Sequence, residues 1–490
     1  MTNSESGGRE PSVADVIFAL ASTTSLLALS VYLFGSDSSA GASQIALVIG
    51  AITSVLIGVK NGFSWKILEE SIIKGIAVAL PAILILFSVG SLIGAWMLSG
   101  TVPTMIYYGL MLLDPAVFYP ATCVICAITA VSIGSSWTVA GTLGIGLVAV
   151  AATLGLSVEI TAGAIISGAY FGDKMSPLSD STNLAPAVTG VDLFTHIRHM
   201  VWTTAPSITL AVIIFAFISW FFPAAEGDAN LEENMSILQQ TFDINLVLLL
   251  PVVLVVYLSV KKIPAVAAIL SGALLGSILA IIYQPDAVRA LAGSGDMGAV
   301  ILVKGIWIAL FDGYVANTGN ATLDNLLSRG GMSSMLHTVW LITAAMAYGS
   351  AMEKTGILGR MADWLLSVGN STGALIASTA ATCLGMNILA GDQYISIVLP
   401  GRMYKAEFEK RGLDAKNLSR VLEDTGTITS PLVPWNTCGA YMAATLGVPT
   451  LAYLPFCFFN LINPVVTIIY GFTNFKIVPI DSLDSVVSGI

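Results

Sequence analysis

The sequence is poor in charged residues. Of its 490 residues, 10% are Asp, Glu, Lys or Arg, whereas 56% are hydrophobic. A soluble domain has about a quarter of its residues charged, because its surface faces water. The shortage of charge excludes an ordinary soluble protein and indicates that much of the surface faces lipid.

Histidine and cysteine are also scarce, with three and five residues. Cys123 and Cys126 form a CxxC pair in an apolar stretch, but no histidine lies near them and the chain has no HExxH motif. A zinc site would need more ligands close by, so we interpret both cysteines as packing residues. Basic patches of the kind that bind nucleic acid are absent as well. We expect no cofactor, no catalytic activity and no nucleic-acid partner.

Long apolar segments fill much of the chain. A helix needs about 20 apolar residues to cross a bilayer, and whole spans are predicted near 12–34, 41–59, 72–98, 200–222, 243–260, 264–283, 300–316, 335–352 and 449–472. Regions 104–170 and 357–446 are broken by Gly, Pro and Ser, and should hold spans near 117–134, 138–154 and 372–389 plus shorter half-helices. Alternating strands of barrel type are absent. The predicted fold class is all-α, a polytopic membrane helix bundle.

Positive charge is distributed unevenly among the loops. Because Lys and Arg gather on the cytoplasmic side, we place 60–71, 190–199, 261–263 and the basic segment 402–420 inside, and 35–40 and 223–242 outside. His196 and His199 fall in 190–199 and are expected to be solvated there. The first eleven residues lack the basic start of a signal peptide, so the first span should be retained. Both chain ends are predicted to be cytoplasmic, in a bacterial inner membrane.

Short sequence matches indicate an internal repeat. The octapeptide 73–80 resembles 303–310, Ser-Pro-Leu at 176–178 recurs at 430–432, and Gly-Val at 190–191 recurs at 447–448. The change in spacing fits an insertion in the second half, at Asn317–Ser334. Since span 41–59 runs inward and its counterpart 264–283 runs outward, the halves have opposite orientation, as in many secondary transporters. The predicted units are 1–40, a first repeat at 41–222, a linker with a connecting helix at 223–263, an inverted repeat at 264–476 and a tail at 477–490.

Two polar, proline-interrupted segments occupy corresponding places in the two halves. They are 172–183 and 423–437, and each is rich in hydroxyls, amides and carboxylates. Proline cannot continue a helical hydrogen-bond ladder, so a backbone carbonyl is released near it. A hard cation such as sodium prefers oxygen ligands of these kinds, and corresponding interrupted helices are the best sequence indication of a transport site.

A second pair of interruptions lies at 134–138 and 385–392. Ser135, Ser136 and Thr138 in the first could line a site or simply pack between close helices, and both interpretations stay open. Asn387 and Asp392 in the second favour function, since a carboxylate at membrane depth is costly. Lys174 is either an ion-paired lysine or part of the site.

Carboxyl groups are the groups that we expect to bind protons and sodium. Asp173, Asp180, Asp392, Glu423 and Asp424 all lie in or beside these interruptions. A carboxyl group in a poorly solvated cavity can hold a proton near neutral pH. If its oxygens also bind sodium, then sodium and protons compete, and exchange across the membrane follows.

These segments resemble the NhaC family of sodium/proton antiporters. The resemblance rests on Gly172–Asp180 with Thr182–Pro186, on Gly391–Tyr394 with Leu399–Tyr404, and on Glu423–Gly426 through Asn436–Gly439, and it covers about residues 40–475. It implies two inverted-topology repeats with broken helices and re-entrant hairpins, and transport of Na⁺ and H⁺ without a bound cofactor. Together with the interrupted segments described above, the resemblance implies the following candidate ion- or substrate-binding residues: Asp173, Ser176, Asp180, Thr182, Asn183, Asn387, Asp392, Asp424, Thr427, Ser430, Asn436 and Thr437. Sodium itself is expected at Asp173, Asp180, Asp392 and Asp424.

An organic-anion exchanger of the malate/lactate type is the alternative, because members of that kind share the same polar segments. A small carboxylate substrate would need a cationic group, for which Lys174 is the obvious candidate. The expected partners are Na⁺, H⁺ and the lipid bilayer, with a homodimer as one option.

Overall fold

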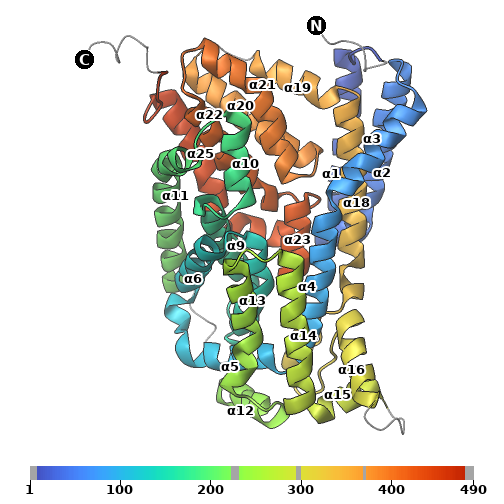
Figure 1. Ribbon diagram of the computed structural model, residues 1–490, viewed down its shortest axis with the longest axis vertical. Coiled ribbons are helices and arrows are strands. Elements are labelled where there is room, and N and C mark those ends of the chain that lie inside the picture. Colours follow the sequence, from blue (N-terminus) through green and yellow to red (C-terminus); the bar gives the residue numbers. More distant parts are fainter. Residues whose placement is uncertain (1–7, 222–230, 294–299, 368–370, 481–490) are drawn as a thin grey trace.

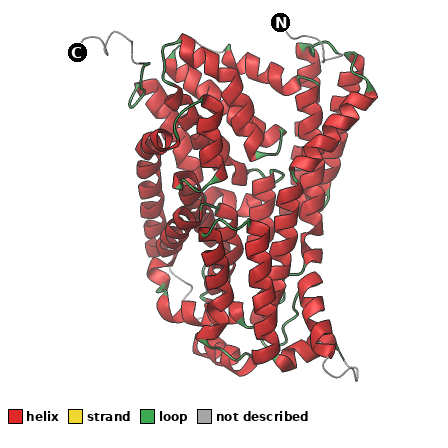
Figure 2. Cartoon of the chain, viewed as in Figure 1, coloured by secondary structure: helices red, strands yellow, loops and turns green. Residues whose placement is uncertain are grey.

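The computed structural model describes residues 8–221, 231–293, 300–367 and 371–480. Within these ranges the secondary structure is helical, apart from one isolated bridge between Leu413 and Pro479 (Figure 2). Eight of the described helices are long and apolar enough to cross a membrane, or up to ten if each of two bent pairs forms one span. The chain is therefore a multi-pass membrane protein of the predicted all-α class.

The helices form two series with a similar order (Figure 1). The first series is α1 (Val13–Phe34), α2 (Ala42–Lys60), α3 (Trp65–Val78), α4 (Leu80–Leu98), α5 (Thr101–Leu112), α6 (Phe118–Ile133), α7 (Ser136–Val139), α8 (Ile145–Thr153), α9 (Val158–Met175), α10 (Asp180–Thr189) and α11 (Leu193–Phe221). After α12 (Leu231–Thr241), the second series is α13 (Leu250–Val260), α14 (Ala265–Tyr283), α15 (Pro285–Ala292), α16 (Val300–Phe311), α17 (Ala321–Leu327), α18 (Leu336–Lys354), α19 (Ile357–Leu366), α20 (Thr372–Leu389), α21 (Gln393–Lys410), α22 (Ala415–Val421), α23 (Thr437–Leu446), α24 (Thr450–Tyr453) and α25 (Phe458–Thr473).

Helices α1, α2, α14, α18 and α20 match predicted spans to within about two residues. The span predicted at 72–98 is instead α3 followed by α4 and begins at Trp65, and the span predicted at 300–316 ends at Phe311. The chain turns back there because Gly313 adopts a φ of 93° and Tyr314 N donates to Arg329 O. The span predicted at 449–472 is divided into two segments that meet at 59°.

One loop prediction is wrong. Helix α11 begins at Leu193, seven residues before the predicted span, so His196 and His199 lie within it and are buried rather than solvated. The cause is tertiary packing, since the start of α11 lies against α22 and His196 Nδ1 is 2.9 Å from Ser419 Oγ.

Two pairs of helices form hairpins whose open ends are closed by hydrogen bonds. In the first, α6 is followed at Gly134 by α7, a π turn and α8, and Ser157 N donates to the Tyr119 hydroxyl at 3.0 Å. In the second, α20 is followed at Gly391 by α21, and Arg411 Nη1 donates to Ser371 O at 3.1 Å. The predicted spans 117–134, 138–154 and 372–389 are therefore arms of helical hairpins.

Two further pairs form broken helices. The first is α9 followed by α10, interrupted at Ser176–Ser179, and the second is α22 with its π turn (Leu422–Thr427), interrupted at 430–436 before α23. Residues before proline avoid helical backbone angles, and Ser176, which precedes Pro177, is extended at ψ 128°. Ser179 and Asn436 then cap the following helices with their side chains. The hairpins and broken helices recur in the same order in both halves, as the predicted repeat requires.

The second half of each broken helix packs on the hairpin of the other half of the chain. The Tyr394 hydroxyl, at the start of α21, donates to Asp180 Oδ2 on α10 at 2.5 Å. The Tyr441 ring on α23 stacks on Trp137 with centroids 4.0 Å apart, and its hydroxyl donates to Trp137 O. This exchange brings all four interruptions to the middle of the molecule.

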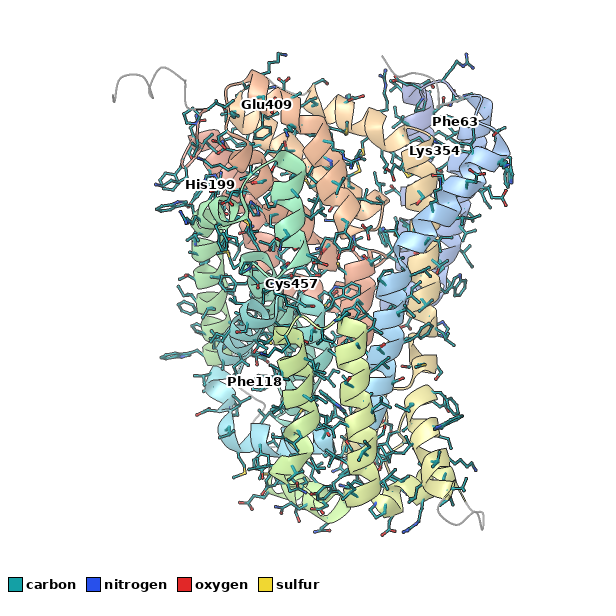
Figure 3. All side chains as sticks on the ribbon, in the orientation of Figure 1. Phe63, Phe118, His199, Lys354, Glu409 and Cys457 are labelled. Atoms are coloured by element: carbon teal, nitrogen blue, oxygen red, sulfur yellow. The ribbon has the colours of Figure 1, made fainter. Side chains whose placement is uncertain are left out.

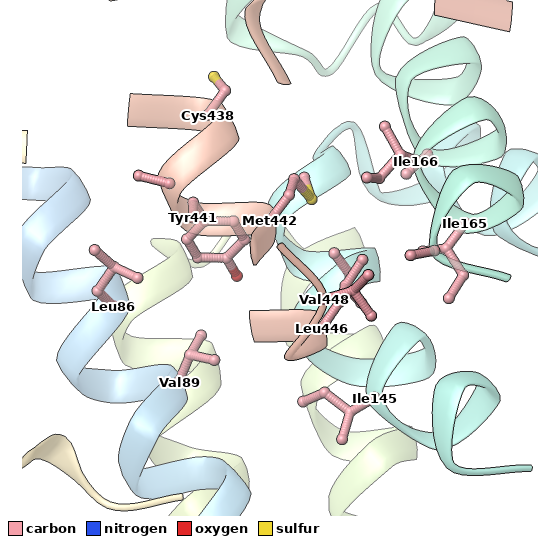
Figure 4. Close-up of a cluster of buried hydrophobic side chains, with 14 of the residues drawn as sticks. Leu86, Val89, Ile145, Ile165, Ile166, Cys438, Tyr441, Met442, Leu446 and Val448 are labelled. Atoms are coloured by element: carbon pink, nitrogen blue, oxygen red, sulfur yellow. The ribbon is translucent and has the colours of Figure 1, made fainter. Parts of the chain in front are cut away.

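An apolar cluster fixes α23 in place. Figure 4 shows Tyr441, Met442 and Leu446 of α23 between Leu86 and Val89 of α4 on one side and Ile145 and Ile165 on the other. These side chains are buried. The contact therefore joins a long spanning helix of the first series to the second broken helix.

Packing between α6 and α9 depends on glycine. A Cβ atom added at Gly168 would lie 2.1 Å from Cys123 O, whereas nothing lies within 4 Å of one added at Gly359 in α19. We expect Gly168→Ala to lower stability by about 1–3 kcal/mol through overpacking. Gly359→Ala, the matched control, should be neutral or slightly stabilising because alanine favours a helix. Thermal unfolding of both purified variants in detergent measures this, and equal midpoints would contradict the close packing.

Candidate ion-binding site

A cavity of about 490 Å³ lies where the four interruptions meet. The first hairpin contributes Gly134, Ser135 and Ser136 at its tip, and the second contributes Asp392 and Tyr394. The broken helices contribute the following polar residues: Asp173, Asp180, Thr437 and Cys438. The turn between α13 and α14 adds Lys262 to the lining. Both halves of the chain therefore build one cavity.

Asp173 is held in place by hydrogen bonds from two of the interruptions. It lies in the last turn of α9 and is 6% exposed. Its Oδ2 accepts hydrogen bonds from Ser136 Oγ at 2.5 Å and Ser136 N at 3.3 Å, and its Oδ1 accepts one from Ser179 Oγ at 2.6 Å. The carboxyl group therefore joins the tip of the first hairpin to the break in the first crossing helix.

Two more carboxylates face the same cavity in different settings. Asp392 is 4% exposed and caps α21, since its Oδ1 accepts from Tyr394 N and Ile395 N at 2.9 and 3.1 Å. Asp180 is exposed and accepts from the Tyr394 hydroxyl. Tyr394 therefore lies between them and contacts both. These groups give the cavity several oxygen atoms and an excess of negative charge.

A row of hydroxyls leads from Asp173 to a second buried carboxylate. Ser179 Oγ is 3.1 Å from Ser181 Oγ, and Ser181 Oγ donates to Glu423 Oε1 at 3.1 Å. Glu423 lies in the π turn after α22 and is 0% exposed. Glu423 does not line the cavity. It is linked to Asp173 by hydrogen bonds through Ser179 and Ser181.

Most of the other predicted residues hold the interruptions in shape. Ser176 Oγ donates to Val131 O, Thr182 Oγ1 to Asp173 O, and Asn183 Nδ2 to Ser179 O. In the second half, Asn387 Nδ2 donates to Gly426 O, Ser430 Oγ to Gln393 Oε1, and Asn436 Nδ2 to Asn387 Oδ1. Thr427 is buried in the π turn, away from the lining residues. Of the twelve predicted residues, four line the cavity: Asp173, Asp180, Asp392 and Thr437.

Comparison with known proteins identifies the relatives of this chain. Residues 168–475 match the model of the Na⁺/H⁺ antiporter family. The Na⁺/H⁺ antiporter NhaC of Alkalihalophilus pseudofirmus is 38% identical over 88% of this chain and 90% of its own.

The chain belongs to the Na⁺/H⁺ antiporter family. The malate-2H⁺/Na⁺-lactate antiporter of Bacillus subtilis is also 38% identical, over 88% of this chain and 89% of its own. The arginine/ornithine antiporter ArcD of Halobacterium salinarum is 35% identical over 96% and 93%. Relatives with different named substrates are thus about equally similar in sequence.

In this antiporter Asp424 is part of a separate, charge-paired cluster. Lys174 donates to its Oδ1, as does Thr203 Oγ1 at 3.1 Å, and Thr467 donates to its Oδ2. Both charged side chains are 0% exposed. The structure thus places Asp424 apart from the other three predicted sodium ligands, and Lys174 is an ion-paired lysine.

Sequence reasoning missed several residues around the cavity. Ser179 and Ser181 lie within the first polar segment but were not selected, and Tyr394 lies two residues after Asp392. Serine and tyrosine are common in membrane helices, so their type alone carries no signal. Their contacts with Asp173 in α9, Glu423 in the π turn and Asp180 in α10 join residues far apart in sequence, which no local pattern encodes.

The buried pair gives a test of stability. Lys174→Met would leave the buried Asp424 carboxylate with Arg420 as its remaining cationic partner, since Arg420 Nε lies 4.0 Å from Asp424 Oδ2. A buried charge left wholly unpaired typically costs about 3–5 kcal/mol, so we expect Lys174→Met to lose less than that. Asp424→Asn should lose more, because it leaves Lys174 and Arg420 without that carboxylate. Arg289→Met, which breaks the exposed pair with Asp286, is the control and should change little. Thermal unfolding of the purified variants measures this, and a Lys174→Met variant as stable as wild type would refute the pairing.

Proposed function

We propose that this protein exchanges Na⁺ for H⁺ across the membrane, with both ions binding in turn at Asp173. The observation that carries this proposal is the position of Asp173, a buried carboxyl group that lines the central cavity and joins the tip of a hairpin to a broken helix. The family and the named activity of the NhaC relative support the same conclusion.

Sodium would bind among carboxylate and hydroxyl oxygens. Asp173, Asp180 and Asp392 come from two different halves of the chain and face one cavity, together with Thr437. Hard cations favour such oxygen ligands. Asp424 is left out of this set because Lys174 already neutralises it.

Competition at one carboxyl group couples the two ions. The ionised form of Asp173 binds sodium, whereas the protonated form does not. Lower pH therefore reduces sodium affinity, and release of sodium on one side allows a proton to bind in its place. Movement of the two halves around the cavity would then expose it alternately to each side.

An organic cation is a second candidate substrate. The cavity volume of about 490 Å³ falls within the range of small-molecule sites, roughly 300–1,000 Å³. Its lining holds three carboxylates against the single charge of Lys262, and aromatic faces at Trp137 and Tyr394. Cations favour carboxylates and aromatic faces, and one relative is named an arginine/ornithine antiporter. The same lining disfavours an organic anion, because Lys174 is paired with Asp424 and lies away from the cavity.

We also propose that both chain ends face the cytoplasm of a bacterial cell, across its inner membrane. Figure 3 shows Phe63, His199 and Glu409 near one end of the molecule. These residues lie in or beside three of the segments that positive charge assigns to the inside. By the positive-inside rule, this end of the molecule would face the cytoplasm.

Transport by Asp173→Asn tests the proposal. In proteoliposomes that contain a pH-sensitive dye, an inward sodium gradient should move protons outward with the wild type and fail to do so with the variant, because an amide cannot exchange a proton. Asp286→Asn, at an exposed surface pair, is the matched control and should behave as wild type.

Added substrates separate the candidates. Each preparation is measured alone, with arginine and with malate or lactate. Proton movement with sodium alone supports the sodium/proton exchanger. Proton movement that requires arginine would favour an organic cation as the substrate. Proton movement that requires malate or lactate would contradict the inference that the carboxylate-rich lining disfavours an organic anion. An Asp173→Asn variant with wild-type exchange would refute the assigned site.

A further inference from the structure

Lys262 brings a positive charge to a cavity that is otherwise lined by negative ones. Among the described residues, four charged side chains line the central cavity: the carboxylates of Asp173, Asp180 and Asp392, and the ammonium group of Lys262. The lysine is exposed, and no described carboxylate forms an ion pair with it. Its charge is therefore not neutralised by a neighbour and acts on any ion that enters the cavity.

The backbone of Lys262 has a conformation that lysine rarely adopts. Its φ is 62°, in the left-handed region that favours glycine, because glycine has no Cβ atom to crowd the chain. Lys262 N donates to Ser259 O at 2.9 Å and Ile263 N donates to Leu258 O at 3.1 Å, which is the hydrogen-bond pattern of a Schellman motif at the end of α13. At most of the described positions with positive φ, this chain has glycine. A lysine in this conformation points to a role for its side chain.

Two common roles of a lysine at a helix end do not account for Lys262. A positive charge stabilises the C-terminal end of a helix, but Lys261 already supplies one at α13, with its Nζ 5.8 Å from the centre of the Tyr257 ring. Lysines also gather at the cytoplasmic ends of membrane helices. Figure 1 shows the turn between α13 and α14 near mid-height of the molecule, rather than at the end where Figure 3 places Glu409. The charge of Lys262 therefore lies at the cavity.

A fixed positive charge discriminates between ions by their charge. Coulomb energy is proportional to the charge of each partner, so Lys262 repels a doubly charged cation twice as strongly as a singly charged one. Three carboxylates around one cavity are otherwise a suitable ligand set for Ca²⁺, which binds several carboxylate oxygens. The lysine thus offsets part of an attraction that would favour calcium over sodium.

We propose that Lys262 makes the cavity selective for singly charged cations and disfavours doubly charged ones such as Ca²⁺. This inference rests on the proposed binding of sodium in the cavity. Lys262 is a specificity-determining residue that acts through its charge and does not coordinate the ion. The same repulsion applies to organic cations, so a molecule with one net positive charge is favoured over one with two.

Removing the charge of Lys262 should raise calcium affinity more than sodium affinity. Lys262→Asn is the test variant, because asparagine is neutral and adopts positive φ more readily than lysine. A round cavity of about 490 Å³ is about 10 Å across, so loss of one charge should raise sodium affinity about twofold to tenfold. Calcium affinity should rise by the square of the same factor, about fourfold to a hundredfold. Lys262→Arg keeps the charge and should keep the wild-type ratio of the two affinities.

The measurement is binding of radioactive sodium to the purified full-length protein and its displacement by calcium chloride, at one pH and constant ionic strength. Lys261→Asn is the matched control, because Lys261 ends the same helix and is absent from the cavity lining. Thermal unfolding of each variant is measured alongside. Lys262→Asn should be at least as stable as wild type, whereas a purely structural role of the lysine would lower the midpoint and leave the ratio of affinities unchanged.

The outcomes separate this inference from the proposed function. A wild-type ratio of calcium to sodium affinity in Lys262→Asn would overturn the selectivity role and leave the sodium/proton exchanger intact. An equal rise of that ratio in Lys261→Asn would overturn it as well, because the effect would then come from the general charge of the surface. Sodium binding by Asp173→Asn equal to that of wild type would instead refute the site on which the inference rests.

Discussion

Inside a membrane, every backbone N–H and C=O group must find a partner within the protein, because lipid offers none. At the four interruptions, backbone groups lack the hydrogen bonds of a continuous helix. They can exist only where other parts of the protein surround them. The structure meets this constraint by bringing the interruptions together. Thr437 N donates to Gly391 O, and Asn387 donates to Gly426 O, so the loops of different hairpins and broken helices satisfy each other. The cavity is a consequence of that meeting.

The charged side chains near these interruptions have two kinds of surroundings. Asp424 of the π turn pairs with Lys174 of α9 and, at 4.0 Å, with Arg420 of α22, and it accepts hydrogen bonds from Thr203 of α11 and Thr467 of α25. Asp173, next to Lys174 in sequence, instead accepts hydrogen bonds from serines and faces the cavity. Adjacent residues on a helix point in different directions, so one helix turn supplies both a buried ion pair and a carboxyl group that lines the cavity.

The broken segments were well predicted, and the partners of individual side chains were not. Pro177 and Pro431 mark the breaks from sequence because proline excludes a helical residue before it. The carboxylates stand out because charge is rare in an apolar chain. In contrast, nothing local distinguishes Asp424 from Asp173, although one is paired and the other lines the cavity. Asn387 and Asn436 stay predicted ion- or substrate-binding residues, but no local pattern predicts that Asn436 Nδ2 donates to Asn387 Oδ1.

The sequence by itself determined that the chain is a helical membrane protein, where its helices break, and that the breaks occur twice in the same order. These features follow from hydropathy, proline and glycine, which act over a few residues. Only the tertiary structure decided that the predicted spans at 117–134 and 138–154 form one hairpin, that His196 and His199 are buried, and that Ser179 and Ser181 join Asp173 to Glu423. Those relations depend on which helix faces which, and the sum of many weak packing contacts between residues far apart in sequence sets that choice.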